Sequence, residues 1–219
     1  MALVRARAPL AGSLAALALI AAGCGGSGTK SATAEAGTPA SAAPANPRCA
    51  HAGGWQRLAN RINAPVYCPG WLPDPLTSQI GGKWNNIDSV SRDRSYLESF
   101  VWQETEAGVN GAGGELHVNL RGYPGVTKIP TCPTGANDSD PAPCFADARG
   151  HVRANGIDAT LFTVNQGADQ WHIALAWRHQ GSLYTLSEHL APPLNYRKVV
   201  QYLHRELRSL VLIKPNRST

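Results

Sequence analysis

The sequence predicts an α+β domain: a curved antiparallel β-sheet packed by an N-terminal and a C-terminal amphipathic helix and cross-linked by disulfides. Three observations support this prediction. Apolar residues recur at helical spacing near both ends of the folded part, segments between these ends read as strands, and four of the five cysteines lie within the same stretch. Helices and strands that occupy separate parts of a chain are typical of the α+β class.

The first 23 residues have the layout of a bacterial export signal. Arg5 and Arg7 precede an uncharged apolar run that is shorter than the about 20 residues of a membrane-spanning helix. The run ends in Ala21-Ala22-Gly23-Cys24, which resembles a lipobox. We therefore expect residues 1–23 to be a lipoprotein signal peptide and Cys24 to carry palmitate, which would anchor the protein to the extracytoplasmic face of the cell membrane. The alternative is an ordinary secretion signal whose cysteine is incidental.

Residues 24–47 are mostly Gly, Ser, Thr, Ala and Pro, with Lys30 and Glu35 as the charged residues. This composition buries too little apolar surface to offset its conformational entropy, so we expect a flexible lipidated tether; a modified mucin-like stalk has the same composition. Residues 48–215 then have the length and apolar content of a single globular extracytoplasmic domain. The net charge of +5 is a mild excess without a clustered basic footprint, so no nucleic-acid partner is expected.

The four remaining cysteines form an even set, as in the disulfide framework of an exported protein. Three connectivities are possible, and proximity along the chain favours Cys49 with Cys68 and Cys132 with Cys144. The competing interpretation is a four-cysteine zinc site. Such a site needs close pairs of the C-x-x-C type, which these spacings do not provide.

The predicted elements begin with a short amphipathic helix, in which Trp55, Leu58 and Ile62 recur at helical spacing after Ala52. Residues 64–73 contain too many prolines for a helix or a central strand, so we expect an extended, irregular segment. Strands are expected over residues 84–90, 96–104, 115–121, 158–165, 171–178 and 183–189. In the third of these, His117, Asn119 and Arg121 alternate with apolar residues, which indicates one buried and one wetter face.

Two stretches between the strands are predicted to be loops. Residues 108–114 are glycine-rich but lack the Gly-Lys-Ser/Thr ending of a phosphate-binding loop, so a hairpin turn is expected. Residues 122–150 are rich in Pro, Asn and Asp and are expected to form a long loop closed by Cys132 and Cys144. Within it, residues 137–140 lack the glycine and distal glutamate of an EF-hand, which favours a solvated turn over a cation site.

The strongest helical pattern closes the chain from about Asn195. Its apolar stripe comprises Tyr196, Val199, Val200, Leu203, Leu207, Leu210 and Val211. The opposite face carries Arg197, Lys198, Gln201, His204, Arg205 and Arg208. This basic face fits either a solvated surface or a position near anionic lipid.

Two histidines meet in the hairpin predicted for the last two strands. Pairing Trp177 with Tyr184 keeps apolar partners on one face of the hairpin. The same register sets His172 opposite His189 on the other face, with Cβ atoms about 5 Å apart. Two imidazoles can share a transition metal or act with a nearby carboxylate. No third ligand and no H-E-x-x-H or G-x-S-x-G motif accompanies them, so we interpret both as polar residues that cover the sheet and assign neither a metal nor another cofactor.

Six tryptophans are many for one domain: Trp55, Trp71, Trp84, Trp102, Trp171 and Trp177. Most are expected to fill the core. Some could instead line a groove for lipid, glycan or peptide, because an aromatic ring offers a large apolar contact area.

One set of segments resembles a known family in their order along the chain. They are Pro65-Val66-Tyr67, Leu72-Pro73, Asn155-Gly156-Ile157-Asp158-Ala159-Thr160-Leu161, Trp177 with Gly181 and Tyr184, and the closing helix. They resemble a bacterial extracytoplasmic domain-of-unknown-function family found in sporulation-associated and anti-sigma-factor-linked proteins. The resemblance brings no catalytic residues, and two cysteine pairs, the long 122–150 segment and the lipid anchor depart from it. A more distant, fold-level similarity is to periplasmic lipoprotein carriers, in which a curved sheet and helices enclose an apolar cavity.

We therefore expect a membrane-anchored cell-envelope lipoprotein that acts as a non-enzymatic binding or interaction module, with no catalytic residue assigned. Its expected partners are the membrane, through the lipid anchor, and an envelope protein or an apolar ligand. Two alternatives stay open. One is a carrier of lipid or another hydrophobic ligand, and the other is a metal-dependent enzyme that uses His172 and His189.

Overall fold

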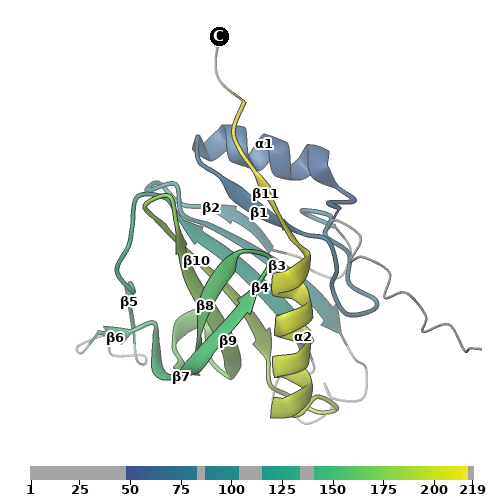
Figure 1. Ribbon diagram of the computed structural model, residues 1–219, viewed down its shortest axis with the longest axis vertical. Coiled ribbons are helices and arrows are strands. Elements are labelled where there is room, and N and C mark those ends of the chain that lie inside the picture. The colour runs from purple at the N-terminus through teal and green to yellow at the C-terminus, as the bar shows by residue number, and fades with distance from the viewer. Residues whose placement is uncertain (1–47, 83–86, 104–114, 134–140, 217–219) are drawn as a thin grey trace, which may run out of the picture. The chain divides into compact units, whose positions relative to one another are not determined.

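The computed structural model describes residues 48–82, 87–103, 115–133 and 141–216, which belong to one compact unit. They form an α+β domain of mostly antiparallel sheet, two α-helices and two disulfides (Figure 1). The helices are α1 (Ala52–Ile62) and α2 (Tyr196–Ser209), and a short 3-10 helix, η2, spans Gly167–Asp169. The strands are β1 (Val66–Pro69), β2 (Ile87–Val90), β3 (Tyr96–Gln103), β4 (Glu115–Tyr123), β5 (Thr131–Cys132), β6 (Ala142–Pro143), β7 (Phe145–Ala154), β8 (Ile157–Asn165), β9 (His172–His179), β10 (Ser182–His189) and β11 (Leu210–Ile213).

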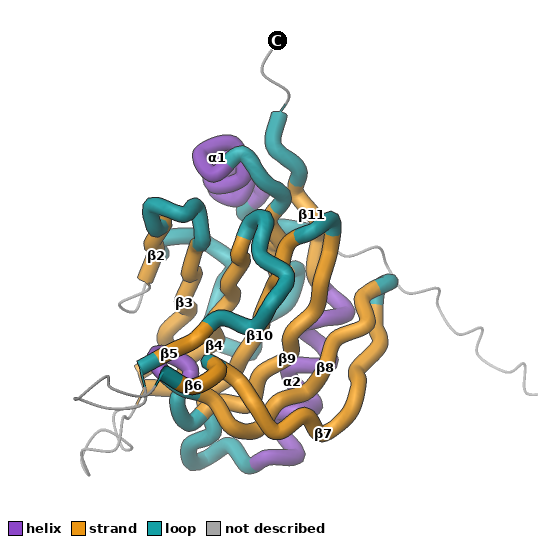
Figure 2. The backbone as a smooth tube through the Cα atoms, turned by 90° about the vertical axis from the view of Figure 1, so that its left-hand side faces the viewer, coloured by secondary structure: helices purple, strands orange, loops and turns teal. Residues whose placement is uncertain are grey.

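Seven strands form the main sheet in the order β2-β3-β4-β10-β9-β8-β7, and each neighbouring pair is antiparallel. The predicted hairpin of the last two strands is confirmed, with Trp177 opposite Tyr184. β4 and β10 are neighbours although about sixty residues separate them in the sequence, so the centre of the sheet is built from segments distant along the chain. Figure 2 views the sheet with the β5–β6 hairpin in front and α2 behind.

The main core lies on the side of the sheet that faces the two helices. α1 contributes Trp55, Leu58, Ala59 and Ile62, and α2 contributes Val199, Leu203 and Leu207. Between them lie the apolar residues of one face of the sheet, among them Leu120, Leu175 and Leu186, each with no exposed surface. Apolar burial on this scale is the dominant favourable contribution to folding.

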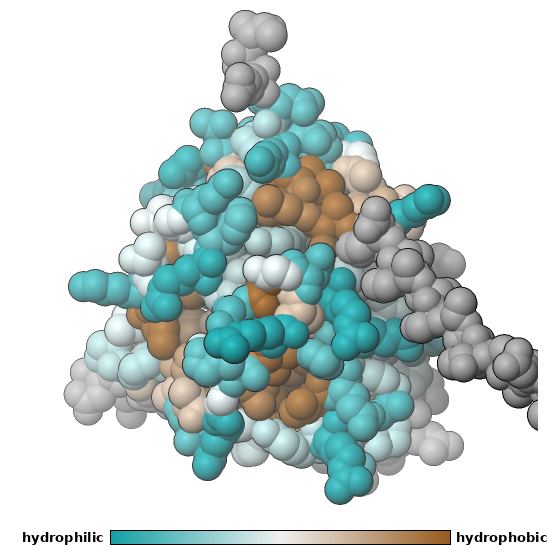
Figure 3. Space-filling model, viewed as in Figure 1, coloured by the Kyte–Doolittle hydropathy of each residue, from teal (hydrophilic) through white to brown (hydrophobic). Residues whose placement is uncertain are grey.

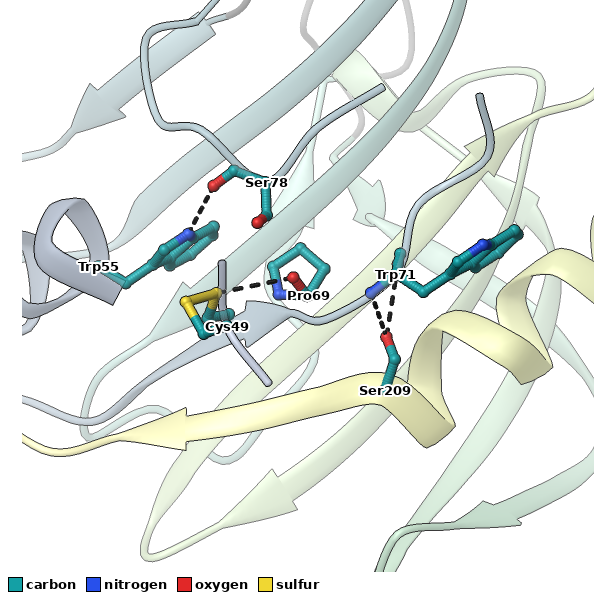
Figure 4. Close-up of a disulfide and its surroundings, with 7 residues drawn as sticks. Cys49, Trp55, Pro69, Trp71, Ser78 and Ser209 are labelled. Carbon is teal, nitrogen blue, oxygen red and sulfur yellow. Dashed lines mark hydrogen bonds between the residues drawn. A yellow bond between two sulfur atoms is a disulfide. The ribbon is translucent and has the colours of Figure 1, made fainter. Parts of the chain in front are cut away.

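The segment after α1 is tied to the end of the chain. β1 pairs with β11, and Cys49 is bonded to Cys68 within β1, across 19 residues (Figure 4). Trp55 donates its indole N–H to the Ser78 carbonyl at 2.8 Å. These contacts hold the proline-rich segment after α1 in place. Its strand partner, β11, lies far away in the sequence.

α2 is shorter than its apolar stripe predicts. It ends at Ser209, and Leu210 and Val211, expected in the helix, belong to β11 instead. The Ser209 hydroxyl accepts the N–H of Trp71 (Figure 4). It also donates to the Glu206 carbonyl, so it occupies polar groups at the helix end. β-branched Val211 and Ile213 fit the strand that β1 requires as its partner. Tyr196 of the predicted stripe is also exposed rather than buried.

The expectation of a continuous loop over residues 122–150 is wrong. β4 extends to Tyr123, the short strands β5 and β6 pair with each other, and β7 begins at Phe145. β7 is an edge strand whose residues are mostly exposed, and its register shifts between Ala148 and Gly150. An irregular edge strand of this kind lacks the apolar alternation by which a strand is recognised.

A second, smaller apolar cluster lies on the opposite face of the sheet. It comprises Cys144, Phe145, Phe162, Ala174, Ala176 and Leu183. The predicted Cys132–Cys144 disulfide is present beside it and closes a 12-residue separation. On the face shown in Figure 3, hydrophilic residues cover most of the surface, and apolar residues gather in a few separate patches.

Several predictions fall outside the described residues. They are the signal peptide 1–23, the lipidation of Cys24, the tether 24–47, the turn at 108–114, the solvated turn at 137–140 and Trp84.

Candidate metal centre

Three histidines from three adjacent central strands converge on the sheet face away from the helices. His189 of β10 lies opposite His172 of β9, as the predicted register requires. The β4–β10 register pairs Glu188 with Val118, and its continuation by one residue sets His117 beside His189. The ring nitrogens that these three side chains offer as ligands all lie within 4.8 Å of one another.

The His172 ring has a fixed orientation. Its Nδ1 lies 3.0 Å from the Ser187 hydroxyl, and that hydroxyl donates its single proton to Asp169 Oδ1 at 2.8 Å. His172 Nδ1 must therefore donate to the serine oxygen, which leaves the lone pair of Nε2 free of a proton. This lone pair faces His117, whose Nε2 lies 2.8 Å away. The network thus assigns the tautomer that presents an acceptor nitrogen to the cluster.

Asp169 organises the surroundings of this histidine. It lies at the end of η2, above the sheet, and accepts a hydrogen bond from the Asn119 amide at 2.9 Å. Its other oxygen, Oδ2, forms an ion pair with Arg121 Nε at 3.0 Å. Asn119 and Arg121 come from β4 on the same face as His117, so one strand supplies a candidate ligand and two supports.

Burial makes His172 a neutral imidazole. The residue is 2% exposed, and its burial, together with the neighbouring His117, His189 and Arg121, lowers its pKa to about 2. Asn165 donates to the His172 carbonyl at 2.6 Å and so holds the backbone as well. A neutral imidazole with a fixed tautomer is the protonation state that a metal ligand needs.

The donor set fits a borderline transition metal. Three imidazoles suit Zn²⁺ or copper, and zinc sites with three protein ligands keep a fourth position for water or another molecule. Tetrahedral zinc with Zn–N bonds of about 2.0–2.1 Å places its donors about 3.3 Å apart. The candidate ligand nitrogens here lie within 4.8 Å of one another, and Nε2 of His172 and Nε2 of His117 are 2.8 Å apart. The Asp169–Ser187–His172 chain is the outer-shell pattern by which carboxylates orient metal-bound histidines.

The rim of the cluster carries a strained aromatic residue. Trp171, next to His172, has φ 66° and is 74% exposed. A bulky residue at positive φ is an outlier, and such outliers concentrate at functional sites. The Trp171 carbonyl accepts the N–H of Leu190, which follows His189, so the same strained turn holds the ends of both histidine strands together.

Sequence reasoning found two of the three histidines and placed them correctly relative to each other. It missed His117 because the pairing of β4 with β10 joins segments far apart in the sequence. The alternation of 115–121 did place His117 on the wetter face, and that was the available signal. The disulfide cysteines lie elsewhere, Cys68 in the main core and Cys144 in the second cluster.

No protein-family model, no curated protein and no solved structure matches the chain. The family resemblance of the sequence segments therefore stays a prediction. Among the described residues, no helix has both the length and the apolar character required to cross a membrane.

Proposed function

We propose that this protein is an extracytoplasmic, membrane-tethered binding module that takes up a transition metal ion of the Zn²⁺ class through His117, His172 and His189. The observation that carries the proposal is the convergence of three imidazoles, one of them held neutral and oriented by Ser187 and Asp169. Ser187 and Asp169 orient the His172 ring, and Asn165 holds its backbone carbonyl.

The burial of the cluster supports binding of an ion rather than coverage of a sheet. His172 is 2% and His189 is 9% exposed, whereas a polar covering residue would keep most of its surface in water. Three imidazoles whose ring centroids lie 4.5–5.3 Å apart also repel one another when protonated. A metal ion removes this conflict, because it binds the neutral form of all three.

With three protein ligands, the fourth position of the ion is open to water or to a group from a partner. We propose a binding module and not an enzyme, because metal binding requires only the three histidines and the two residues that orient His172. The proposed extracytoplasmic location rests on the expected lipidation of Cys24. A lipid anchor would hold the site outside the cytoplasm, where an envelope protein or a free ion can reach it.

The lipid-carrier alternative has less support from the cavity under the sheet, and a larger hollow of about 530 Å³, lined by Tyr67, Trp177 and residues 210–212 among others, lies away from it. The cavity between the sheet and α2 has a volume of about 200 Å³. Pockets that hold drug-sized ligands have about 300–1,000 Å³, and an acyl chain would need more room than this cavity offers.

The test compares two histidine variants of the purified full-length protein. Zinc should bind wild type with 1:1 stoichiometry and stabilise it by about 2.7 kcal/mol at a free concentration a hundred times Kd. For a domain of this size, this corresponds to a rise in Tm of roughly 5–10 °C. His172→Ala should remove the rise, and His151→Ala, a change at an exposed histidine of the edge strand, should retain it. A wild-type Tm that stoichiometric zinc or copper leaves unchanged contradicts the proposal.

A further inference from the structure

A cavity of about 200 Å³ lies under the sheet, on the side opposite the histidine rings. Its walls are mainly apolar and come from the segment of residues 73–76, which includes Asp74, from β3, β4 and β10, and from α2 with the segment before it. The residues that matter below are Trp102, Leu116, Val118, Leu194, Tyr202 and Glu188. A carboxyl group in such surroundings requires an explanation, because an uncompensated buried polar group is costly.

The Glu188 carboxyl is almost completely buried and incompletely paired. The residue is 2% exposed, and its Oε2 has no hydrogen-bond partner among the described residues. Glu206 of α2 is fully buried nearby, and neither of its carboxyl oxygens has a partner there either. Burial raises the pKa of both groups, and Glu206 raises that of Glu188 further. Glu188 therefore brings a buried carboxyl oxygen without a hydrogen-bond partner among the described residues to the wall of this cavity, and the Glu206 carboxyl acts on it from α2.

Lys198, the cation that acts on the Glu188 carboxyl, does not fill these positions. Lys198 lowers the pKa of Glu188 from a distance, but its side chain is exposed. Its ammonium lies over the Tyr202 ring, 4.6 Å from the centroid. The site thus already shows the pairing of an ammonium with an aromatic ring at its margin, while the buried acceptor inside lacks a donor.

The size and lining of the cavity define the class of ligand. An apolar cavity of about 150 Å³ accommodates benzene, so this one has room for one ring or a short alkyl chain together with a polar head. A hard divalent cation is a poorer fit, because Ca²⁺ takes about six to eight oxygen ligands and the walls here are mostly carbon. We propose that this cavity binds a small amphiphilic amine, with its ammonium donating to Glu188 and its apolar part against Trp102 and Leu194.

The amine site is separate from the metal centre. His117 borders the cavity, but Glu188 points to the helix-facing side of β10, and neighbouring Ser187 and His189 point to the other. The two proposals share no donor atom. A wild-type protein that binds zinc but not the amine would therefore overturn this inference alone.

The experiment measures the affinity of the full-length protein for benzylammonium and for benzyl alcohol, which has the same ring without the charge. Wild type should bind benzylammonium at least tenfold more tightly, because only the ammonium offers charged donors to the buried carboxyl. Glu188→Gln should remove this preference. Glu98→Gln is the matched control, because Glu98 is also a buried glutamate on the helix-facing side of the sheet but does not line this cavity.

Three results would overturn the inference: no binding of either probe, equal affinity for both probes in wild type, or a preference that survives in Glu188→Gln. A second measurement keeps the test decisive if Glu188→Gln does not fold. Nuclear Overhauser contacts in wild type should connect the benzylammonium ring with the Trp102 side chain. Contacts confined to residues outside the cavity would count against the site.

Discussion

Consecutive residues of β10 meet two different environments, although all eight of its residues are buried. Leu186 and Glu188 face the two helices, whereas Ser187 and His189 face η2 and the neighbouring histidines. Polar side chains occur on both faces. What differs is how they are satisfied.

On the histidine side, the polar groups around Asp169 and His172 satisfy one another, whereas Asn165 Oδ1 and the Thr185 hydroxyl have no hydrogen-bond partner among the described residues. Asp169 receives hydrogen bonds from Asn119 and Ser187 and an ion pair from Arg121, and the chain of contacts ends at the His172 ring. On the helix side, carboxyl oxygens of Glu98, Glu188 and Glu206 lack partners among the described residues. A satisfied network is rigid and can position a ligand atom. Unsatisfied buried carboxyls instead indicate a site that a ligand completes, or a carboxyl that stays protonated.

The largest expected effect is on the free energy of unfolding, in a variant of the main core that should not change zinc binding. Leu186→Ala should lower the free energy of unfolding by about 2–5 kcal/mol, because it removes a fully buried side chain from the main core. Zinc affinity of the folded protein should not change, since Leu186 faces away from the histidines. Urea denaturation and zinc titration check the two statements. A zinc affinity that falls together with stability would show that the two faces are not independent.

The pH dependence of stability tests whether the buried Glu98 carboxyl on the helix side is protonated. Burial raises the pKa of Glu98 from 4.5 to about 9, the Asp88 carboxylate raises it as well, and Arg61 lowers it. The folded protein therefore keeps a proton that the unfolded chain loses above about pH 4.5. The stability from this group is complete below that pH and is lost as the pH rises toward about 9.

In this range, Glu98→Gln should reduce the loss of stability by about 1.4 kcal/mol per pH unit. Denaturation at several pH values between about 6 and 8 measures this slope. Asp147→Asn, at an exposed carboxyl, is the control and should leave the slope as in wild type. An unchanged slope in Glu98→Gln would mean that this carboxyl is already ionised in the folded protein.

A smaller effect tests the histidine side. Ser187→Ala removes the acceptor of His172 Nδ1–H and should weaken zinc binding by about 10–100-fold, the usual effect of losing an outer-shell partner. Thr185→Val is the matched control, because the Thr185 hydroxyl is buried in the same strand without a hydrogen-bond partner among the described residues. Calorimetric titration of both variants gives the comparison. Equal zinc affinities of the two variants would show that Ser187 does not support the metal site.

The same contrast explains what could be predicted from sequence. The helix side follows from apolar periodicity, and the β9–β10 hairpin follows from local pairing, which brought His172 and His189 together. His117 joins them through a strand pair that no local pattern encodes, and Asp169 reaches the site through a short 3-10 turn. β7 and β11 were missed for another reason: an exposed edge strand and the end of a helical stripe have no strand signal of their own.

The central claim is tested most directly by zinc-edge anomalous diffraction from crystals of the full-length protein equilibrated with stoichiometric zinc. One strong peak is predicted between the rings of His117, His172 and His189, within about 2.0–2.1 Å of a nitrogen of each. No peak there, or a peak bonded to surface residues instead, would contradict the claim that these three strands build a metal site.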